Sequence, residues 1–95
     1  MRRYKVETRL FWAWQIEQEC QWLQEMSREG WDLVSWRPMK HYYFRRSETP
    51  QERQYHIERA RFSVHAQERQ LNTRAEEGWE LVAQAWGWVF YSKPA

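Results

Sequence analysis

The residues best suited to bind a ligand lie in one short segment, 37–46, which mixes basic and aromatic side chains. The segment holds Arg37, Lys40, Arg45 and Arg46 together with three aromatic residues, and it contains no acidic residue. An aromatic ring can stack on a planar ligand while a guanidinium binds its phosphate. A nucleotide, a nucleotide-derived signal or single-stranded nucleic acid would suit such a segment. Charged side chains that protect an edge strand explain the same pattern without any ligand.

Tryptophans elsewhere in the chain extend this candidate site. We expect a non-catalytic binding module whose aromatic and arginine-rich sheet face, or a cleft between two copies, sequesters a nucleotide-like or other planar anionic small molecule. An alternative is a protein–protein interaction or assembly module, and a second alternative is single-stranded nucleic-acid binding. The candidate ligand-binding residues are Trp36, Arg37, Tyr42, Arg45, Arg46, Trp86 and Trp88.

Catalytic and metal-binding patterns do not emerge from the sequence. The three histidines, His41, His56 and His65, have no spacing that pairs them as metal ligands, and no nucleophile, phosphate-loop or zinc-protease motif is present. Cys20 lies on an apolar helix face, where a core role is expected. We therefore predict no enzyme activity, no metal and no cofactor.

Composition bounds the class of protein. A chain of 95 residues makes one domain, 1–95, and its single cysteine excludes disulfides and favours a reducing compartment. No apolar run approaches the length needed to span a bilayer, and no signal peptide is recognisable, so we expect a soluble cytoplasmic protein. A net charge of +2 makes nucleic acid an unlikely partner.

An internal repeat is the strongest structural signal. The sequence Tyr4-Lys5-Val6-Glu7 recurs as Tyr55-His56-Ile57-Glu58, and Gly30-Trp31-Asp32-Leu33-Val34 recurs as Gly78-Trp79-Glu80-Leu81-Val82. These matches occur in the same order with small drifts in spacing. They predict two β-α-β-β repeats, at 1–46 and 54–95, joined by a linker at 47–53.

The expected elements follow from residue patterns in each repeat. Ile16, Cys20, Leu23 and Met26 fall on one helix face, and a glycine follows each helix where a left-handed residue commonly ends one. The other helix face is expected to be solvated, with the glutamates Glu17, Glu19, Glu25 and Glu29. The predicted strands are 3–12, 31–36, 39–46, 54–63, 79–85 and 86–92, and the predicted helices are 15–29 and 65–77.

These elements predict an α+β fold, a roughly six-stranded sheet with two helices on one face and pseudo-twofold symmetry. A strand that leads through a helix into a neighbouring parallel strand crosses over right-handed, which places both helices on the same side. The strands carry apolar residues on both faces, and two helices can cover only one. We therefore expect a homodimer or higher homo-oligomer that uses the second face.

The order of these aromatic and glycine motifs resembles a bacterial family of unknown function, often encoded beside PadR-type regulators. The resemblance spans nearly the whole chain and supports the fold, but it implies no activity because the family has none established. It rests on Phe11-Trp12-Ala13-Trp14, Trp22-Leu23, Gly30-Trp31, Tyr42-Tyr43-Phe44, Gly78-Trp79-Glu80-Leu81-Val82-Ala83, Trp86-Gly87-Trp88 and Lys93-Pro94.

Overall fold

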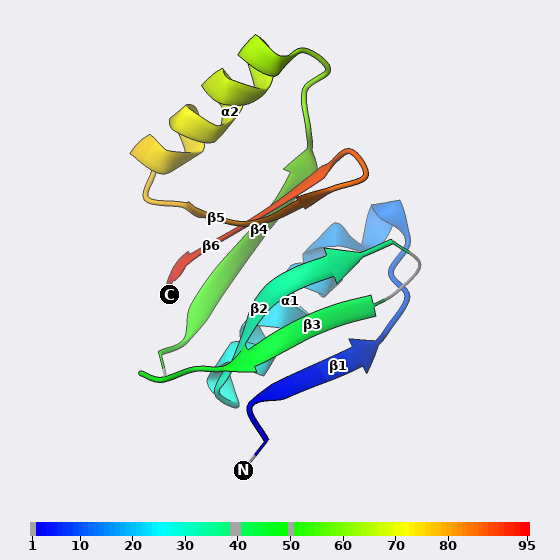
Figure 1. Cartoon of the computed structure of the whole chain (residues 1–95), viewed down its shortest axis with the longest axis vertical. Helices are drawn as coiled ribbons and strands as arrows, with labels where there is room; N and C mark the ends of the chain where they lie inside the picture. The colour runs from blue at the N-terminus through cyan, green and yellow to red at the C-terminus, as the bar shows by residue number, and fades with distance from the viewer. Residues whose placement is uncertain (1, 39–40, 50) are drawn as a thin grey trace.

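The computed structural model describes residues 2–38, 41–49 and 51–95 and has an α+β fold (Figure 1). Two three-stranded sheets hold six strands, with the order β1-β3-β2 in sheet A and β4-β6-β5 in sheet B. The elements are β1 (Tyr4–Thr8), a 3₁₀ turn η1 (Ala13–Gln15), α1 (Ile16–Arg28), β2 (Trp31–Arg37), β3 (His41–Arg46), β4 (Arg53–Arg59), α2 (Val64–Glu76), β5 (Glu80–Ala85) and β6 (Trp88–Pro94). Met39 and Lys40 of the expected strand, and Pro50 of the expected linker, lie outside the described residues.

The predicted six strands and two helices are confirmed, whereas the prediction of one shared sheet is wrong. All paired strands in both sheets are antiparallel, and the third strand of each sheet lies between the other two. The strand after each helix turns back in a hairpin, and it is this returning strand that pairs with the strand before the helix. The two parallel strands of a unit are therefore separated by an antiparallel one.

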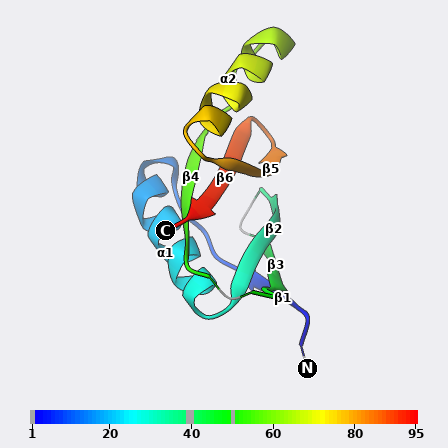
Figure 2. The same cartoon turned by 90° about the vertical axis from the view of Figure 1, so that its left-hand side faces the viewer.

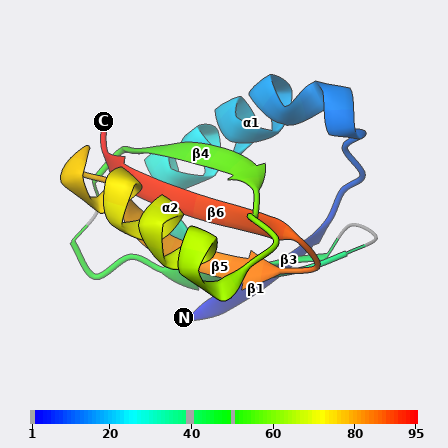
Figure 3. The ribbon, with the colours of Figure 1, turned by 90° about the horizontal axis from the view of Figure 1, so that it is seen from above.

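The helices lie on different faces, which corrects the expectation that both cover one side. Sheet B lies across one edge of the first unit, with β4 against α1 and β5 beside β2 (Figures 2 and 3). The opposite face of sheet B carries α2, which lies at the end of the molecule (Figure 1). Sheet B is consequently covered on both faces, while α1 is the one described helix that covers sheet A.

The two sheets share their detailed geometry. In sheet A, Val6 is opposite Tyr43, and in sheet B, Ile57 is opposite Phe90. Each sheet also has a register irregularity at the corresponding place, after Leu33 and after Leu81. The common origin of the two halves stays a prediction of the sequence.

The apolar face of α1 forms the centre of the core. Leu23 has no exposed surface and Met26 is 5% exposed, as the helical spacing predicts. The helix ends at Gly30, whose φ of 91° is in the left-handed region that glycine adopts without strain. The buried core cluster comprises Leu23, Met26, Trp31, Leu33, Tyr42, Phe44, Tyr55, Ile57 and Phe90.

The second helix is attached to the fold by polar contacts. None of its residues is fully buried, as expected from its sparse apolar residues. The Ser63 side chain accepts a hydrogen bond from the backbone N–H of Ala66, which caps the first turn. Glu58 of β4 binds Gln70 and Arg74 of α2, at 2.8 and 2.7 Å, so one carboxylate links the helix to sheet B.

Candidate functional site

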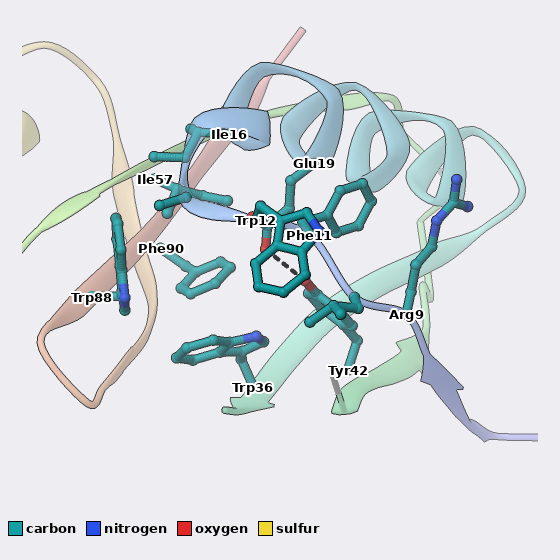
Figure 4. A pocket seen from close by; sticks show the side chains of 12 residues that line it. Arg9, Phe11, Trp12, Ile16, Glu19, Trp36, Tyr42, Ile57, Trp88 and Phe90 are labelled. Atoms are coloured by element: carbon teal, nitrogen blue, oxygen red, sulfur yellow. Dashed lines mark hydrogen bonds between the residues drawn. The ribbon is translucent and has the colours of Figure 1, made fainter. Parts of the chain in front are cut away.

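A pocket of about 200 Å³ opens where α1, both sheets and the β1–α1 connection meet (Figure 4). Side chains from six separate segments line it, so it exists only when both halves of the chain are folded together. Its volume suits a molecule of one or two rings, below the range typical of drug-sized ligands. The lining residues are Arg9, Leu10, Phe11, Trp12, Ala13, Ile16, Glu19, Trp36, Tyr42, Ile57, Trp88 and Phe90.

The connection from β1 to α1 forms one wall because a local hydrogen-bonded turn fixes its path. The backbone N–H of Trp12 donates to Oε1 of Gln15 at 2.9 Å, and the Gln15 N–H donates to the Trp12 carbonyl at 2.8 Å. This reciprocal pair resembles a capping box at the start of a helix. In Figure 4, the Trp12 indole consequently lies in front of the polar group of the pocket.

That polar group is a buried pair of acid and phenol. The hydroxyl of Tyr42 donates to Oε2 of Glu19 at 2.6 Å, and Glu19 is 8% exposed. Burial raises the pKa of Glu19, an effect that the Tyr42 hydrogen bond partly offsets. Burial also raises the pKa of Tyr42, and the neighbouring Glu19 adds to it, so this phenol stays protonated.

Oε1 of Glu19 has no hydrogen-bond donor among the parts of the chain that the structure describes. Glu19 also forms no ion pair with a described lysine, arginine or histidine. A buried carboxyl group without a cationic partner is costly when ionised. This site can therefore accept a hydrogen bond from a ligand that enters the pocket.

Aromatic rings surround the carboxyl group and leave a surface for stacking. Trp36 of β2 and Phe90 of β6 lie 5.0 Å apart between ring centroids, which joins the two sheets at the floor of the pocket. Phe11 meets Tyr42 edge to face at 6.3 Å. Rings in these arrangements bind planar molecules by stacking and edge contacts. The indole of Trp88 in β6 forms one side of the pocket (Figure 4).

One arginine lines the pocket, and a second lies over one of its aromatic rings. The guanidinium of Arg9 lies over the rings of Phe11 and Trp22, at 5.2 and 5.1 Å from their centroids. Arg59 lies over Trp88 at 4.8 Å. Both arginines are exposed, so their donors remain available to an anionic group that projects from the pocket.

The structure brings together only part of the set expected from the sequence. Trp36, Tyr42 and Trp88 line the pocket. The others lie elsewhere: Arg37 over Tyr43 at 5.9 Å, Arg46 over Trp31 at 4.3 Å, Arg45 exposed in β3, and Trp86 77% exposed at the β5–β6 turn.

Glu19 is the main residue that the sequence analysis missed, because it was expected on the solvated face of the helix. The signal was present, since Glu19 follows Ile16 by three residues and precedes Leu23 by four, which places it on the buried side. Phe11 and Phe90 were also absent from the candidate set, and only the packing of the two sheets reveals their role.

Comparison with known proteins identifies the family. The model of a family of proteins of unknown function, DUF2812, matches residues 15–95. The chain belongs to the DUF2812 family. No curated protein and no solved structure matches this DUF2812 chain.

Three further findings concern a metal site, a reactive thiol and a membrane-spanning helix in this DUF2812 chain. The described residues contain no group of histidine, cysteine, aspartate or glutamate that could hold a metal ion. Burial raises the pKa of Cys20 to about 11, so its thiol is a weak nucleophile at neutral pH. Within the described parts of the chain, no helix is long and apolar enough to cross a membrane.

Proposed function

We propose that this protein is a non-catalytic module that binds a planar, nucleotide-like small molecule, with the ring system held in the aromatic pocket. The observation that carries the proposal is the buried Glu19 carboxyl group, hydrogen-bonded to Tyr42 on one oxygen and enclosed by aromatic rings. The rings provide stacking, and the carboxyl group selects a ring that carries N–H donors.

The charges around the pocket suit the two ends of a nucleotide. A base with N–H groups can donate to Oε1 of Glu19, and this charge-assisted bond relieves the cost of burying the carboxylate. The phosphate then projects outward toward the exposed guanidinium groups of Arg9, which lines the pocket, and Arg59, which lies over Trp88. Sequestration without conversion fits the residues that line the pocket, among which there is no serine, cysteine, histidine or lysine.

The proposal places the protein in the cytoplasm, where nucleotides are abundant and cysteines stay reduced. Its single cysteine is free and half-buried.

A nucleotide panel tests the proposal on the purified chain. We expect GMP at 1 mM to raise the melting temperature and to change tryptophan fluorescence, because guanine presents adjacent N–H donors that a carboxylate accepts. A ligand present at 100 times its dissociation constant stabilises the fold by about 2.7 kcal/mol. AMP and UMP should produce smaller shifts, since each presents fewer donors in that arrangement.

Matched variants locate the binding site. Glu19→Gln keeps the size of the side chain and removes its charge, so affinity for GMP should fall about tenfold. Trp36→Ala removes a stacking surface, whereas Trp86→Ala removes an exposed tryptophan outside the pocket and should leave binding unchanged. The absence of any shift with all nucleotides refutes the proposal, and equal binding to a single-stranded oligonucleotide favours nucleic acid instead.

Self-assembly is the second candidate function. One face of sheet A, on which the exposed Tyr4 and Val6 lie opposite Arg45 and Tyr43, is not covered by any helix or strand that the structure describes.

A further inference from the structure

The two halves of the chain meet through one well-packed contact. Tyr55 and Ile57 of β4 point away from α2 and are 7% and 5% exposed, because α1 and β2 cover them. The hydroxyl of Tyr55 accepts a hydrogen bond from the backbone N–H of Leu33 in β2 at 3.2 Å. Ser27 of α1 binds the backbone of Arg53, which fixes the helix along β4. A sheet face is thus buried by the helix and edge strand of the other unit.

Sheet A has the corresponding face, and no helix or strand within residues 2–38, 41–49 and 51–95 covers it. The strand registers place Tyr4 and Val6 of β1 where Tyr55 and Ile57 stand in β4. Tyr4 is 64% exposed and Val6 is 60% exposed. Exposed apolar side chains that are adjacent on one strand face mark a surface for contact with another molecule.

The second unit also has an outer surface that corresponds to the covering surface of the first. Leu81 of β5 holds the register position of Leu33, immediately before the irregularity in each strand pair. Leu33 is 4% exposed whereas Leu81 is 52% exposed. Val64 begins α2 as Ile16 begins α1, and Val64 is 78% exposed. Val64 and Leu81 are therefore exposed apolar residues of the second unit whose counterparts, Ile16 and Leu33, are covered in the first unit.

We propose that a second copy of this chain places its α2–β5 surface on the open face of sheet A, which repeats the contact between the two halves. The α2–β5 surface is defined by Val64 and Leu81, and the open face by Tyr4 and Val6. Within one chain these surfaces lie at opposite ends, with α2 far from β1 (Figure 1). In a dimer, the α2–β5 surface of each copy covers the open face of sheet A of the other copy. These two reciprocal contacts leave neither surface exposed, so the assembly closes at two copies.

Opposite charges lie near the ends of the two surfaces that this pairing brings together. At the edge of the internal contact, Arg28 in the last turn of α1 binds Glu52 at 2.7 Å. At the corresponding place in α2 stands Glu76, and the strand registers place Arg2 and Arg3, directly before β1, where Arg53 and Gln54 follow Glu52. An acidic residue on the helix would thus meet basic residues beside the strand, so the second contact keeps an opposite-charge pair.

Light scattering of the full chain tests the proposal. We expect a particle of twice the 12.0 kDa of one chain at micromolar concentration. Val6→Glu and Val64→Glu should each weaken assembly about a hundredfold, because each buries an unpaired carboxylate in both contacts of the dimer. Both positions are exposed in the single chain, so its fold should survive, as circular dichroism can confirm. Gln21→Glu, a change at an exposed residue in the middle of α1, should assemble like the original chain.

Mixing the two disrupted variants distinguishes this arrangement from others. The Val6→Glu chain keeps an intact α2–β5 surface and the Val64→Glu chain keeps an intact open face, so one normal contact can form between them. We therefore expect a 1:1 complex in the mixture, although each variant alone is monomeric. A monomeric original chain overturns the proposal. Failure of the mixture to associate also overturns it, since a contact between two identical open faces would behave in this way.

Discussion

The replacement Tyr42→Phe tests whether the Glu19 carboxyl group depends on a single donor. The change keeps the ring, which is 2% exposed, and removes the hydroxyl that binds Glu19 at 2.6 Å. A hydrogen bond to a charged group contributes about 1.5–3 kcal/mol, and an unsatisfied buried partner costs a similar amount. For a domain of this size, each kcal/mol shifts the melting temperature by about 4–8 °C. We expect a decrease of roughly 6–24 °C at pH 7.

The pH dependence provides a second measure of the same contact. Burial raises the pKa of Glu19 above 4.5, so the folded state holds this proton more tightly than the unfolded state. The contribution of Glu19 to stability is therefore greatest at low pH and declines as pH rises above about 4.5. Tyr42→Phe should steepen this decline because it removes the hydrogen bond that lowers the pKa, whereas Glu19→Gln should abolish it.

Thermal unfolding followed by circular dichroism from pH 4 to 8 measures both effects. A double-mutant cycle with Tyr42→Phe and Glu19→Gln isolates the energy of the pair. Additive effects of the two changes, or a Tyr42→Phe chain with unaltered melting temperature at pH 7, would refute this account of the pocket.

Three further predictions concern the scaffold around the pocket. Leu23→Ala should lower the free energy of unfolding by about 2–5 kcal/mol in a urea titration, because Leu23 is fully buried beneath both sheets. Burial raises the pKa of Glu58, but hydrogen bonds from Arg74, His56 and Tyr91 lower it further, to about 2. The stability that Glu58 provides is present above about pH 4.5 and is lost as pH falls towards 2. Hydrogen exchange of the α2 amides should therefore accelerate over that pH range. Glu58→Gln should remove this pH dependence. Gly30→Ala should cost about 1–2 kcal/mol by chemical denaturation, since an alanine at a φ of 91° is strained; an unchanged midpoint would contradict this.

Local patterns in the sequence were sufficient to predict the elements. The apolar spacing of α1 and the glycines after both helices placed the helix bounds within one residue, because helical periodicity and left-handed caps are properties of neighbouring residues. The strand before each helix was predicted too long. The described strand β1 ends at Thr8, and the aromatic residues that follow it belong to the pocket wall.

The arrangement of the elements could not be predicted in the same way. Strand pairing depends on contacts between distant residues, and both faces of the strands carry apolar side chains, so the sequence favours one sheet as much as two. The pocket illustrates the consequence. Trp36 and Phe90 are far apart in the sequence and meet only because sheet B crosses the edge of the first unit. Segment 37–46 was singled out by composition, but its arginines lie on the surface away from the pocket.

The hydrogen bond between Tyr55 and Leu33 has a consequence for the newly made chain. It occupies a backbone donor on the outer edge of β2, an edge that would otherwise be open to pairing with a strand from another molecule. That protection comes from a residue in the second half, which leaves the ribosome later than β2 does. Until Tyr55 emerges, the nascent first half carries an exposed strand edge, and this interval is when misassembly with other nascent chains is most favoured.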